Sequence, residues 1–335
     1  MALTDEYGRP LRDLRVSVTD RCNFRCTYCM PKEIFNREWE FLARDSLLSF
    51  EEITRIVGLF SRLGVTKLRI TGGEPMMRRG IVDLVSRLAR IQEIDDIAMT
   101  TNGSLLERHA ANLAVAGLDR VSVSLDSLDN ATFMAMNDAG FSVDRVLEGI
   151  DAAAAAALTP IKINMVVQRG VNDGDVLAVA EYFRDTGHIV RFIEYMDVGH
   201  TNGWRLNDVV PAAEIVDIVA SAHEIEPLEA QYPGEVARRW GYIDGSGEFG
   251  VISSVSQPFC GSCVRARISA EGMLYTCLFA TSGIDLRRPL RDGSSDEELM
   301  SLISKVWEKR NDRYSEIRSE AIVNLPKVEM SYIGG

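Results

Sequence analysis

Histidine is scarce in this chain. Only four of the 335 residues are histidine, and none lies close in sequence to a cysteine group. Long apolar runs are missing too, since the longest, at 151–161, falls far short of the ~18 residues that span a membrane and is interrupted by Pro160. Basic charge is also low, because the net charge is −12. The sequence therefore excludes a membrane helix and disfavours general binding to nucleic acids or anionic membranes, which needs a basic face.

The start of the chain shows no targeting signal. Residues 1–14 carry charges from Asp5 onward, without the apolar core of a secretory signal or the Arg/Ser-rich character of a transit peptide. We therefore expect a cytoplasmic protein with no nucleic-acid or membrane partner. The length allows one large α/β barrel domain or two ordinary domains. If the substrate is an anion, so acidic a chain must gather positive charge locally.

All six cysteines fall into two compact groups. These are Cys22, Cys26 and Cys29, which we call the first triplet, and Cys260, Cys263 and Cys277, which we call the second triplet. In a reducing cytosol, metal or cluster ligation explains such groups better than disulfides do. Six buried hydrophobic cysteines are the alternative, but residues scattered at random would rarely form two triplets.

Short β-branched runs alternate with amphipathic stretches over the first two-thirds of the chain. The runs predict strands at 14–20, 67–71, 97–101, 120–126, 161–167 and 190–196. The amphipathic stretches predict helices at 50–63, 80–91, 104–116, 143–157 and 174–186. The first helix should begin with a capping box of Ser49 and Glu52. Six β–α units with right-handed crossovers predict an incomplete (βα)6 parallel barrel, two units short of the usual eight.

Several of these strands should carry a polar, partly cationic face, because alternate residues share one side of a strand. The polar positions are Arg15, Ser17, Thr19, Lys67, Arg69, Thr71, Ser122, Ser124, Asp126, Lys162 and Asn164. A closed eight-stranded barrel would instead fill its interior with branched apolar residues. A solvated sheet face is the alternative, but strands flanked by helices are rarely left wet. We therefore expect an open barrel that holds a large polar ligand.

The β–α rhythm ends near residue 225. The turn-rich stretch that follows leads into the second triplet, a helix predicted near 296–309 and a tail that ends in Gly-Gly. We predict an α/β protein with a barrel domain at 4–225 and a smaller C-terminal region at 226–335, which packs against the barrel and carries the second triplet.

The first triplet has the spacing C-x3-C-x2-C and follows the first predicted strand, at the end where βα barrels place their reactive centres. A zinc ion with three cysteines and one water is possible, but structural zinc takes four protein ligands. Three thiolates on an iron–sulfur cubane leave one iron open to another ligand. After the second strand comes TGGEP, in which Gly72 and Gly73 allow close approach of the backbone to a ligand. Glu74 can take an ammonium group there, whereas a tight βα turn is the default interpretation of Gly-Gly alone.

The second triplet has the spacing C-x2-C-x13-C and lacks the fourth ligand of a zinc ribbon. This favours a second open cluster, whose free iron could hold substrate directly. Arg265 and Arg267 lie beside it, on one face if the segment is extended. Arginine is suited to bidentate contact with phosphate or carboxylate.

With an aromatic residue, Tyr28, before the third cysteine, these motifs resemble the radical S-adenosylmethionine (SAM) superfamily and, within it, the GTP 3′,8-cyclase family. The resemblance runs nearly end to end, through LRVSVTDRCNFRCTYCM, RITGGEP, TTNG, VSLDS, RFIEYMDVG, PFCGSCVRAR and the terminal GG. It implies a lyase of the first step of molybdenum-cofactor biosynthesis. In this chemistry a 5′-deoxyadenosyl radical from SAM removes the C3′ hydrogen of GTP, and C3′ then bonds to guanine C8 to give (8S)-3′,8-cyclo-7,8-dihydroguanosine 5′-triphosphate.

The resemblance also implies cofactors and residue roles. Each triplet would hold a [4Fe–4S] cluster. The implied SAM-binding residues are Tyr28, Gly73, Ser124 and Met196. The implied GTP-binding residues are Arg15, Arg69, Thr100, Lys162, Arg191, Arg265 and Arg267. Catalytic roles are implied for the first triplet, for Arg265 and Arg267, and for the terminal Gly334 and Gly335, although composition alone would favour a frayed end.

The implied partners are a flavodoxin or ferredoxin as electron donor, a downstream cyclic pyranopterin monophosphate synthase, and a second copy of the chain in a homodimer. Three alternatives stay open. A peptide-modifying radical SAM maturase usually carries more C-terminal cysteines. A zinc-stabilised binding module would use both triplets structurally. A plain electron-transfer protein would not need a polar barrel interior or the arginines.

Overall fold

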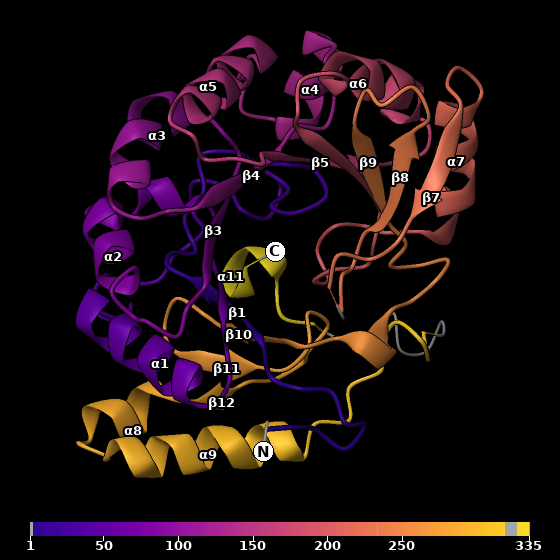
Figure 1. The fold of residues 1–335 in the computed structure, drawn as a ribbon. Helices are drawn as coiled ribbons and strands as arrows, with labels where there is room; N and C mark the ends of the chain where they lie inside the picture. Colours follow the sequence, from indigo (N-terminus) through magenta and orange to yellow (C-terminus); the bar gives the residue numbers. More distant parts are fainter. Residues whose placement is uncertain (1–2, 233, 319–326, 335) are drawn as a thin grey trace.

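The computed structural model describes residues 3–232, 234–318 and 327–334. Six parallel strands follow one another in chain order at the centre of its sheet. They are β1 (Asp13–Ser17), β2 (Lys67–Thr71), β3 (Asp96–Thr101), β4 (Arg120–Ser124), β5 (Lys162–Val167) and β6 (Ile189–Glu194). The sheet curves, and helices cover its outer face (Figure 1). The predicted α/β fold with a parallel sheet is thereby confirmed.

The connections between the strands form the outer layer. Its helices are α1 (Phe50–Arg62), α2 (Ile81–Leu88), α3 (Leu106–Val115), α4 (Asn130–Asn137), α5 (Val143–Ala155), α6 (Val176–Phe183) and α7 (Ala212–Ala220), with short 3-10 turns at η1 (Pro75–Met77), η2 (Asp173–Asp175) and η3 (Leu206–Asp208). Helix α1 begins at the predicted capping box, in which the Ser49 amide donates to the Glu52 carboxylate over 2.7 Å and the Glu52 amide donates to the Ser49 hydroxyl over 3.1 Å. The sequence pattern predicts neither α4 nor α7.

Strands from the C-terminal part of the chain extend the sheet at both ends. They are β7 (Ile225–Leu228), β8 (Arg238–Tyr242), β9 (Glu248–Ile252), β10 (Arg265–Ile268), β11 (Met273–Tyr275) and β12 (Ile284–Asp285). β9 pairs in parallel with β6, and β10 pairs in parallel with β1. The order is β12-β11-β10-β1-β2-β3-β4-β5-β6-β9-β8-β7, so the sheet has two ends and does not close. The turn-rich stretch after residue 225, for which no strand is predicted, thus supplies three strands, β7, β8 and β9. The division into 4–225 and 226–335 stays a prediction.

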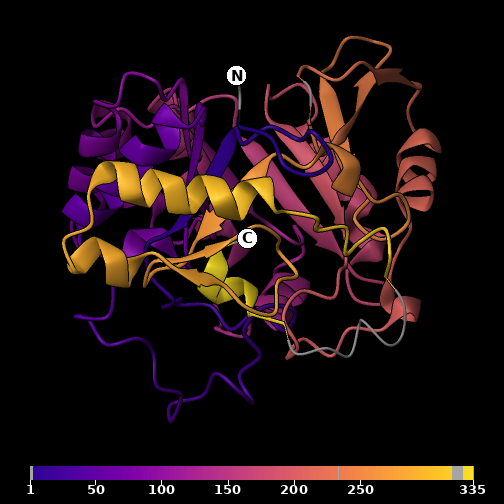
Figure 2. The ribbon, with the colours of Figure 1, turned by 90° about the horizontal axis from the view of Figure 1, so that it is seen from below.

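The C-terminal helices pack outside and inside the sheet. Helix α8 (Arg287–Arg291) and helix α9 (Asp296–Glu308), which is predicted near 296–309, lie along the underside beside the N-terminal segment (Figure 2). Trp307 of α9 is buried and donates through its indole N–H to the carbonyl of Arg9 over 3.2 Å. The short helix α11 (Met330–Ile333) lies inside the curve of the sheet (Figure 1).

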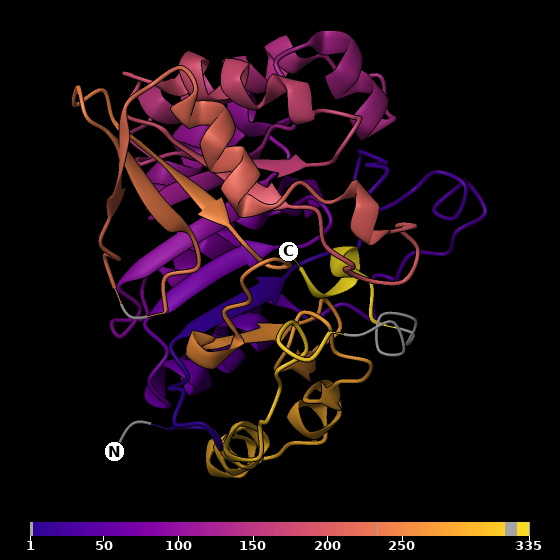
Figure 3. The same cartoon turned by 90° about the vertical axis from the view of Figure 1, so that its right-hand side faces the viewer.

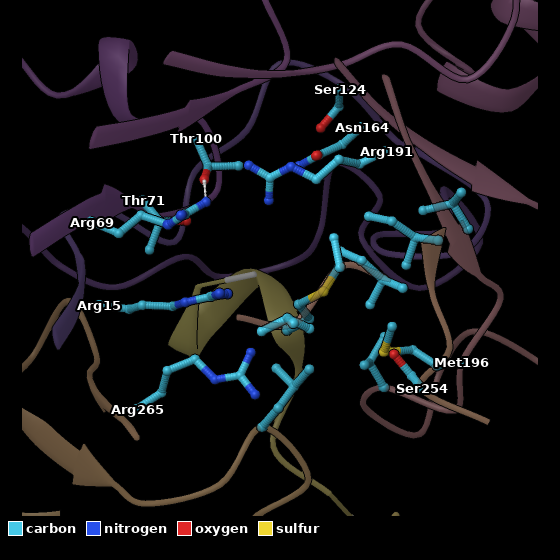
Figure 4. A pocket seen from close by; sticks show the side chains of 18 of the residues that line it. Arg15, Arg69, Thr71, Thr100, Ser124, Asn164, Arg191, Met196, Ser254 and Arg265 are labelled. Atoms are coloured by element: carbon cyan, nitrogen blue, oxygen red, sulfur yellow. Dashed lines mark hydrogen bonds between the residues drawn. The ribbon is translucent and has the colours of Figure 1, made fainter. Parts of the chain in front are cut away.

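The central strands have two different faces, as their alternation predicts. Leu14, Val16 and Ile70 are buried toward the helices with at most 1% of their surface exposed, whereas Arg15 and Arg69 point to the inside of the curve (Figure 4). The long connection from β1 to α1 projects from the body of the molecule (Figure 3). Within the described residues, no helix has the length and apolar character to cross a membrane.

Candidate active site

Both cysteine triplets line one cavity of about 500 Å³ inside the curve of the sheet. The same cavity is lined by every residue for which SAM or GTP binding is implied: Tyr28, Gly73, Ser124, Met196, Arg15, Arg69, Thr100, Lys162, Arg191, Arg265 and Arg267. Figure 4 shows arginines from several strands pointing into it. Of the residues predicted on the polar faces, Ser17, Thr19 and Ser122 do not line the cavity. Folding therefore joins groups that lie as far apart in sequence as the two triplets.

The strand register places arginines side by side. Arg15 on β1 is opposite Arg69 on β2 and opposite Arg267 on β10. Across the cavity, Arg191 on β6 stands opposite Asn164 on β5. Like charges placed opposite one another destabilise a sheet. Such a row of cations favours the binding of an anion between them.

These cations have few partners in the protein itself. None of Arg15, Arg69, Lys162 and Arg191 forms an ion pair with a carboxylate in the described part of the chain, although Arg69 donates weakly to the Thr100 hydroxyl over 3.4 Å (Figure 4). Arg15 Nε, Arg69 Nε and one terminal nitrogen of Arg191 are buried without a hydrogen-bond partner. A buried charge without a partner is costly, so these orphaned donors fit a ligand that carries several negative charges.

Burial also changes the charge state of the cavity wall. The pKa of Arg191 is lowered to about 9, first by burial and then by repulsion from Arg69. The pKa of Lys162 is lowered to about 7, first by burial and then by repulsion from Arg191 and other arginines. An anion bound among these side chains would oppose both shifts, because it stabilises their charged forms.

The first triplet is presented by the loop that follows β1. The amides of Cys29 and Met30 both donate to the carbonyl of Cys26 over 2.9 Å, which makes a tight turn between two of the cysteines. The Cys22 sulfur accepts from the Phe24 amide at 3.4 Å and from the Asn102 side chain at 3.7 Å.

The thiols of the first triplet are hard to ionise on their own. Burial, followed by the charge of Glu74, raises the pKa of Cys22 to about 11. Burial likewise raises the pKa of Cys26 and of Cys29 far above the ordinary thiol value. Thiolates bind metals and thiols do not, so cationic iron would supply the charge that favours their deprotonation. Three half-buried cysteines that face a polar cavity are a donor set that fits an iron–sulfur cubane with one open iron.

Residues implied in SAM binding surround the first triplet from four elements. Gly73 follows β2, Ser124 ends β4, and Met196 follows β6. The Tyr28 hydroxyl donates to the Asp126 carboxylate over 2.7 Å, which fixes the ring beside Cys29. The carboxyl ends of parallel strands are where such folds bind their ligands, and the structure brings these residues together there.

The glycines of TGGEP pack against the backbone of Thr19 and Arg21, and Gly73 also lines the cavity. A Cβ on Gly72 would lie 2.7 Å from the carbonyl oxygen of Thr19, and one on Gly73 would collide with the carbonyl of Arg21. The Gly73 amide donates to the Thr19 carbonyl over 2.7 Å. The glycines therefore let the end of β2 dock on the segment that leads into Cys22, while Gly73 also lines the cavity.

The expectation that Glu74 accepts an ammonium group from a ligand is wrong. Glu74 is fully buried and does not line the cavity. Its oxygens accept from the amides of Met76 and Asn102 at 3.2 and 2.8 Å and from the Thr101 hydroxyl at 2.9 and 3.0 Å. Burial raises its pKa to about 7. Its role is to fix the loop after β2 against the end of β3.

The second triplet has a cationic setting. Cys260 lies in the turn η4 (Cys260–Ser262), and Cys263 immediately follows it. Arg310 donates to the Cys263 sulfur over 3.2 Å and to its carbonyl over 2.7 Å, while Arg265 donates to the same sulfur over 3.4 Å. Burial acts to raise the pKa of Cys263, but the two arginines outweigh it and lower the pKa to about 6. Burial, followed by the charge of Asp312, raises the pKa of Cys277 to about 12.

Two arginines that bind the backbone of the second triplet, Arg9 and Arg310, are not predicted from the sequence. Arg9 donates to the carbonyl of Cys260 over 2.7 Å, and both Arg9 and Arg310 pair with the buried Asp5. Neither arginine belongs to a recognisable motif, because Arg9 precedes the first strand and Arg310 follows the last helix of the predicted series. No local signal in the sequence could have assigned them to Cys263.

The C-terminal tail reaches the arginine row. Arg267 donates to the carbonyl of Gly334, and a Cβ on Gly334 would collide with the Thr71 side chain. Gly334 also has a positive φ of 77°, which disfavours other residues. Tyr332 donates to Glu271 and helps to hold the tail. Gly335 lies outside the described residues.

Within residues 3–232, 234–318 and 327–334, no three His, Cys, Asp or Glu side chains are arranged to grip a single metal ion. The cysteines of a cubane each bind a different iron atom. The cluster sites are therefore judged from the donor sets described above.

Known proteins resemble this chain along its whole length. It matches the model of the Radical SAM superfamily over residues 16–183 and that of Molybdenum Cofactor Synthesis C over 188–316. It is 54% identical to a GTP 3′,8-cyclase of Acidothermus cellulolyticus and 48% identical to that of Staphylococcus carnosus, with 99% of both chains covered in each case.

Among solved structures, Streptococcus suis SuiB bound to S-adenosylmethionine matches with a TM-score of 0.63 over 95% of this chain and 72% of that chain. At 14% identity this likeness concerns the fold alone. The full-length identity to the curated relatives is far higher and spans the strands, both triplets and the tail. The chain therefore belongs to the GTP 3′,8-cyclase family of the radical SAM superfamily.

Proposed function

We propose that this protein is a GTP 3′,8-cyclase that acts in the first step of molybdenum-cofactor biosynthesis. The observation that carries the proposal is a single cavity in which both triplets meet a row of orphaned cations. A family member without the cations could not hold a nucleoside triphosphate. An anion-binding protein without the triplets would have no source of a radical.

Each triplet holds one [4Fe–4S] cluster in this proposal, and each cluster keeps one iron free of protein ligands. When bound, the first cluster and SAM supply the radical that removes a hydrogen atom. Tyr28, Gly73, Ser124 and Met196 surround the SAM molecule from the carboxyl ends of the strands. The half-buried first triplet faces the cavity, so a bound SAM molecule would lie between its cysteines and the substrate.

The triphosphate binds to the cation row. Arg15, Arg69, Lys162 and Arg191 neutralise its charge, and the orphaned N–H groups of the three arginines donate to its oxygens. Arg265 and Arg267 extend the row to the second triplet, which would hold the cluster that offers a ligand position to the guanine. Holding the nucleotide at both ends fixes the ribose between the triplets, which is the orientation that a hydrogen transfer requires.

The reaction breaks the C3′–H bond of GTP and forms a bond between C3′ and guanine C8. The cyclised nucleotide then needs one electron and one proton to reach the closed-shell product. We propose a flavodoxin or ferredoxin as the electron donor and a cyclic pyranopterin monophosphate synthase as the enzyme that consumes the product. A cytoplasmic location and a homodimer belong to the same proposal.

The test is anaerobic reconstitution of the full chain with iron and sulfide, followed by addition of reductant and SAM. We expect 5′-deoxyadenosine to form with GTP present, at the same rate as GTP is consumed. GTP replaced by ATP is the matched control, because it keeps the triphosphate and changes the base. SAM cleavage that ignores GTP would contradict the assigned substrate, and two zinc ions in place of iron would support the binding module instead.

A further inference from the structure

The two triplets lie in opposite electrostatic surroundings. Carboxylates dominate the electrostatic neighbourhood of the first triplet: they are Glu74, Asp126 and Glu329. Arg25 is a cation that acts on Cys22, and its guanidinium donates to the backbone carbonyls of Cys22 and Phe24 and not to a sulfur. Within the described residues, the Cys22 sulfur accepts hydrogen bonds from neutral donors, the Phe24 backbone amide and the Asn102 side-chain amide.

Charged donors dominate at the second triplet. Arg310 and Arg265 both donate directly to the sulfur of Cys263, over 3.2 and 3.4 Å. Asp312 acts on Cys277 and also pairs with Arg310 over 3.3 Å, but neither it nor another carboxylate contacts the Cys263 sulfur within the described residues. The same donor type, three cysteines, is thus set among carboxylates at one end of the cavity and against arginines at the other.

Arg310 is held where it is by buried contacts on every side. Its side chain is 1% exposed. It pairs with Asp5 over 3.1 Å and donates to the carbonyls of Thr276 and Cys263 over 3.1 and 2.7 Å. A guanidinium fixed by so many bonds cannot turn away when the charge on the neighbouring sulfur changes. Its positive charge therefore stays beside the Cys263 sulfur in both oxidation states of a bound cluster.

We propose that Arg310 is a positioning residue that raises the reduction potential of the cluster on the second triplet above that of the cluster on the first triplet. The inference rests on the proposed function, since it requires a cluster at each site. Reduction adds one negative charge to a cluster. Nearby cations and N–H···S hydrogen bonds stabilise that charge, whereas nearby carboxylates oppose it.

The consequence is an order of reduction. An electron carrier of intermediate potential reduces the second cluster and leaves the first oxidised, so SAM is not cleaved. The first cluster is reduced only by a stronger donor or when a ligand changes its surroundings. Keeping the radical-forming site as the harder one to reduce protects the enzyme from cleaving SAM while the substrate site is empty.

The test is a redox titration of the reconstituted full-length protein at pH 8.5, in which electron paramagnetic resonance detects the reduced clusters. The full-length variants Cys29→Ser and Cys277→Ser assign the two signals, because each disrupts one site. We expect the second cluster to be reduced at the higher potential. In Arg310→Gln, we expect the ratio of reduced to oxidised second cluster at a fixed potential to fall at least tenfold, which equals about 59 mV for one electron.

Matched variants separate a change in potential from a loss of structure. Arg310→Lys keeps the charge but offers fewer donors, so we expect a smaller shift in the same direction, and it serves as the test if Arg310→Gln does not fold. Asn102→Ala removes a neutral donor at the first triplet and should lower the potential of the first cluster only.

Two results would overturn the inference: a second cluster with a potential equal to or below that of the first, or a potential unchanged in both Arg310 variants. Failure of the proposed function shows in other measurements. The protein would bind zinc in place of the about eight iron atoms that two clusters need, or it would cleave SAM at a rate that does not depend on GTP.

Discussion

The two triplets reach the same cavity by different routes. The first lies within eight consecutive residues after β1, and a local turn at Cys26 brings its members together. The second is spread over residues 260–277 and is held by Arg9 and Arg310, which come from opposite ends of the chain. A contiguous motif fixes the ligand spacing, but surroundings that come from distant segments fix the charge around it. Equal donor sets can therefore be given different chemistry by the residues around them.

The largest expected effect comes from removing one cysteine at each site. Cys29→Ser should abolish SAM cleavage, whereas Cys277→Ser should keep slow SAM cleavage and lose cyclisation. Each loss should exceed the ~100-fold that is typical when a residue that only supports a ligand is removed. Measurement of 5′-deoxyadenosine and of cyclised nucleotide in parallel checks this. Normal cyclisation by Cys277→Ser would remove the functional difference between the triplets.

The cation row that joins the triplets gives the next largest effect. Arg15→Gln should weaken GTP binding about 10- to 100-fold, because a hydrogen bond to a charged group contributes about 1.5–3 kcal/mol. Equilibrium binding of GTP to the anaerobic protein measures this. Arg55→Gln is the control, since its partly exposed pair with Asp296 lies on the outer surface. If Arg15→Gln and the wild-type protein bound GTP with equal affinity, the triphosphate would not bind at Arg15.

The packing of Gly334 against Arg267 and Thr71 should affect cyclisation of GTP more than it affects SAM cleavage. In Gly334→Ala the new methyl group meets Thr71, and the positive φ adds about 1–2 kcal/mol of strain. We expect cyclisation to fall roughly tenfold, with faster release of the C-terminal residues by carboxypeptidase. The double variant with Thr71→Ser is expected to recover part of the loss, because it removes the clashing methyl group. Full activity in Gly334→Ala would make the tail a passive end.

The smallest expected effect is a pH dependence of GTP affinity that arises from Lys162 in the cavity wall. Lys162 has a pKa of about 7, lowered by burial and by Arg191, Arg120 and Arg69, while Glu235 opposes the shift. A bound triphosphate raises this pKa, so the lysine takes up a proton on binding above pH 7. GTP affinity should therefore fall as the pH rises from 7 to 9, by at most about tenfold per pH unit.

Calorimetry in two buffers of different ionisation enthalpy measures the proton uptake at Lys162. Lys162→Arg should bind GTP with a flatter pH profile, because a guanidinium keeps its charge in this range. An unchanged slope in Lys162→Arg would assign the proton to another group, such as the nucleotide itself.

Much of the fold could be predicted from local patterns. The six central strands follow from short β-branched runs, and α1 follows from the capping box of Ser49 and Glu52. The polar inner face of the strands follows from alternation, which is why Arg15 and Arg69 could be assigned to a cavity. The outer strands could not be predicted this way, because β10 pairs with β1 across some 250 positions of the chain.

The ligand types, their spacing and the side of the strands that faces the interior can be read from local sequence, because these depend on neighbours within a few residues. The surroundings of the site depend on the tertiary fold. It placed the second triplet against Arg310, turned Glu74 inward to fix a loop, and set Arg267 beside the carbonyl of Gly334. The physical reason is that charge and burial are summed over everything nearby in space, and most of what surrounds these groups lies far away along the chain.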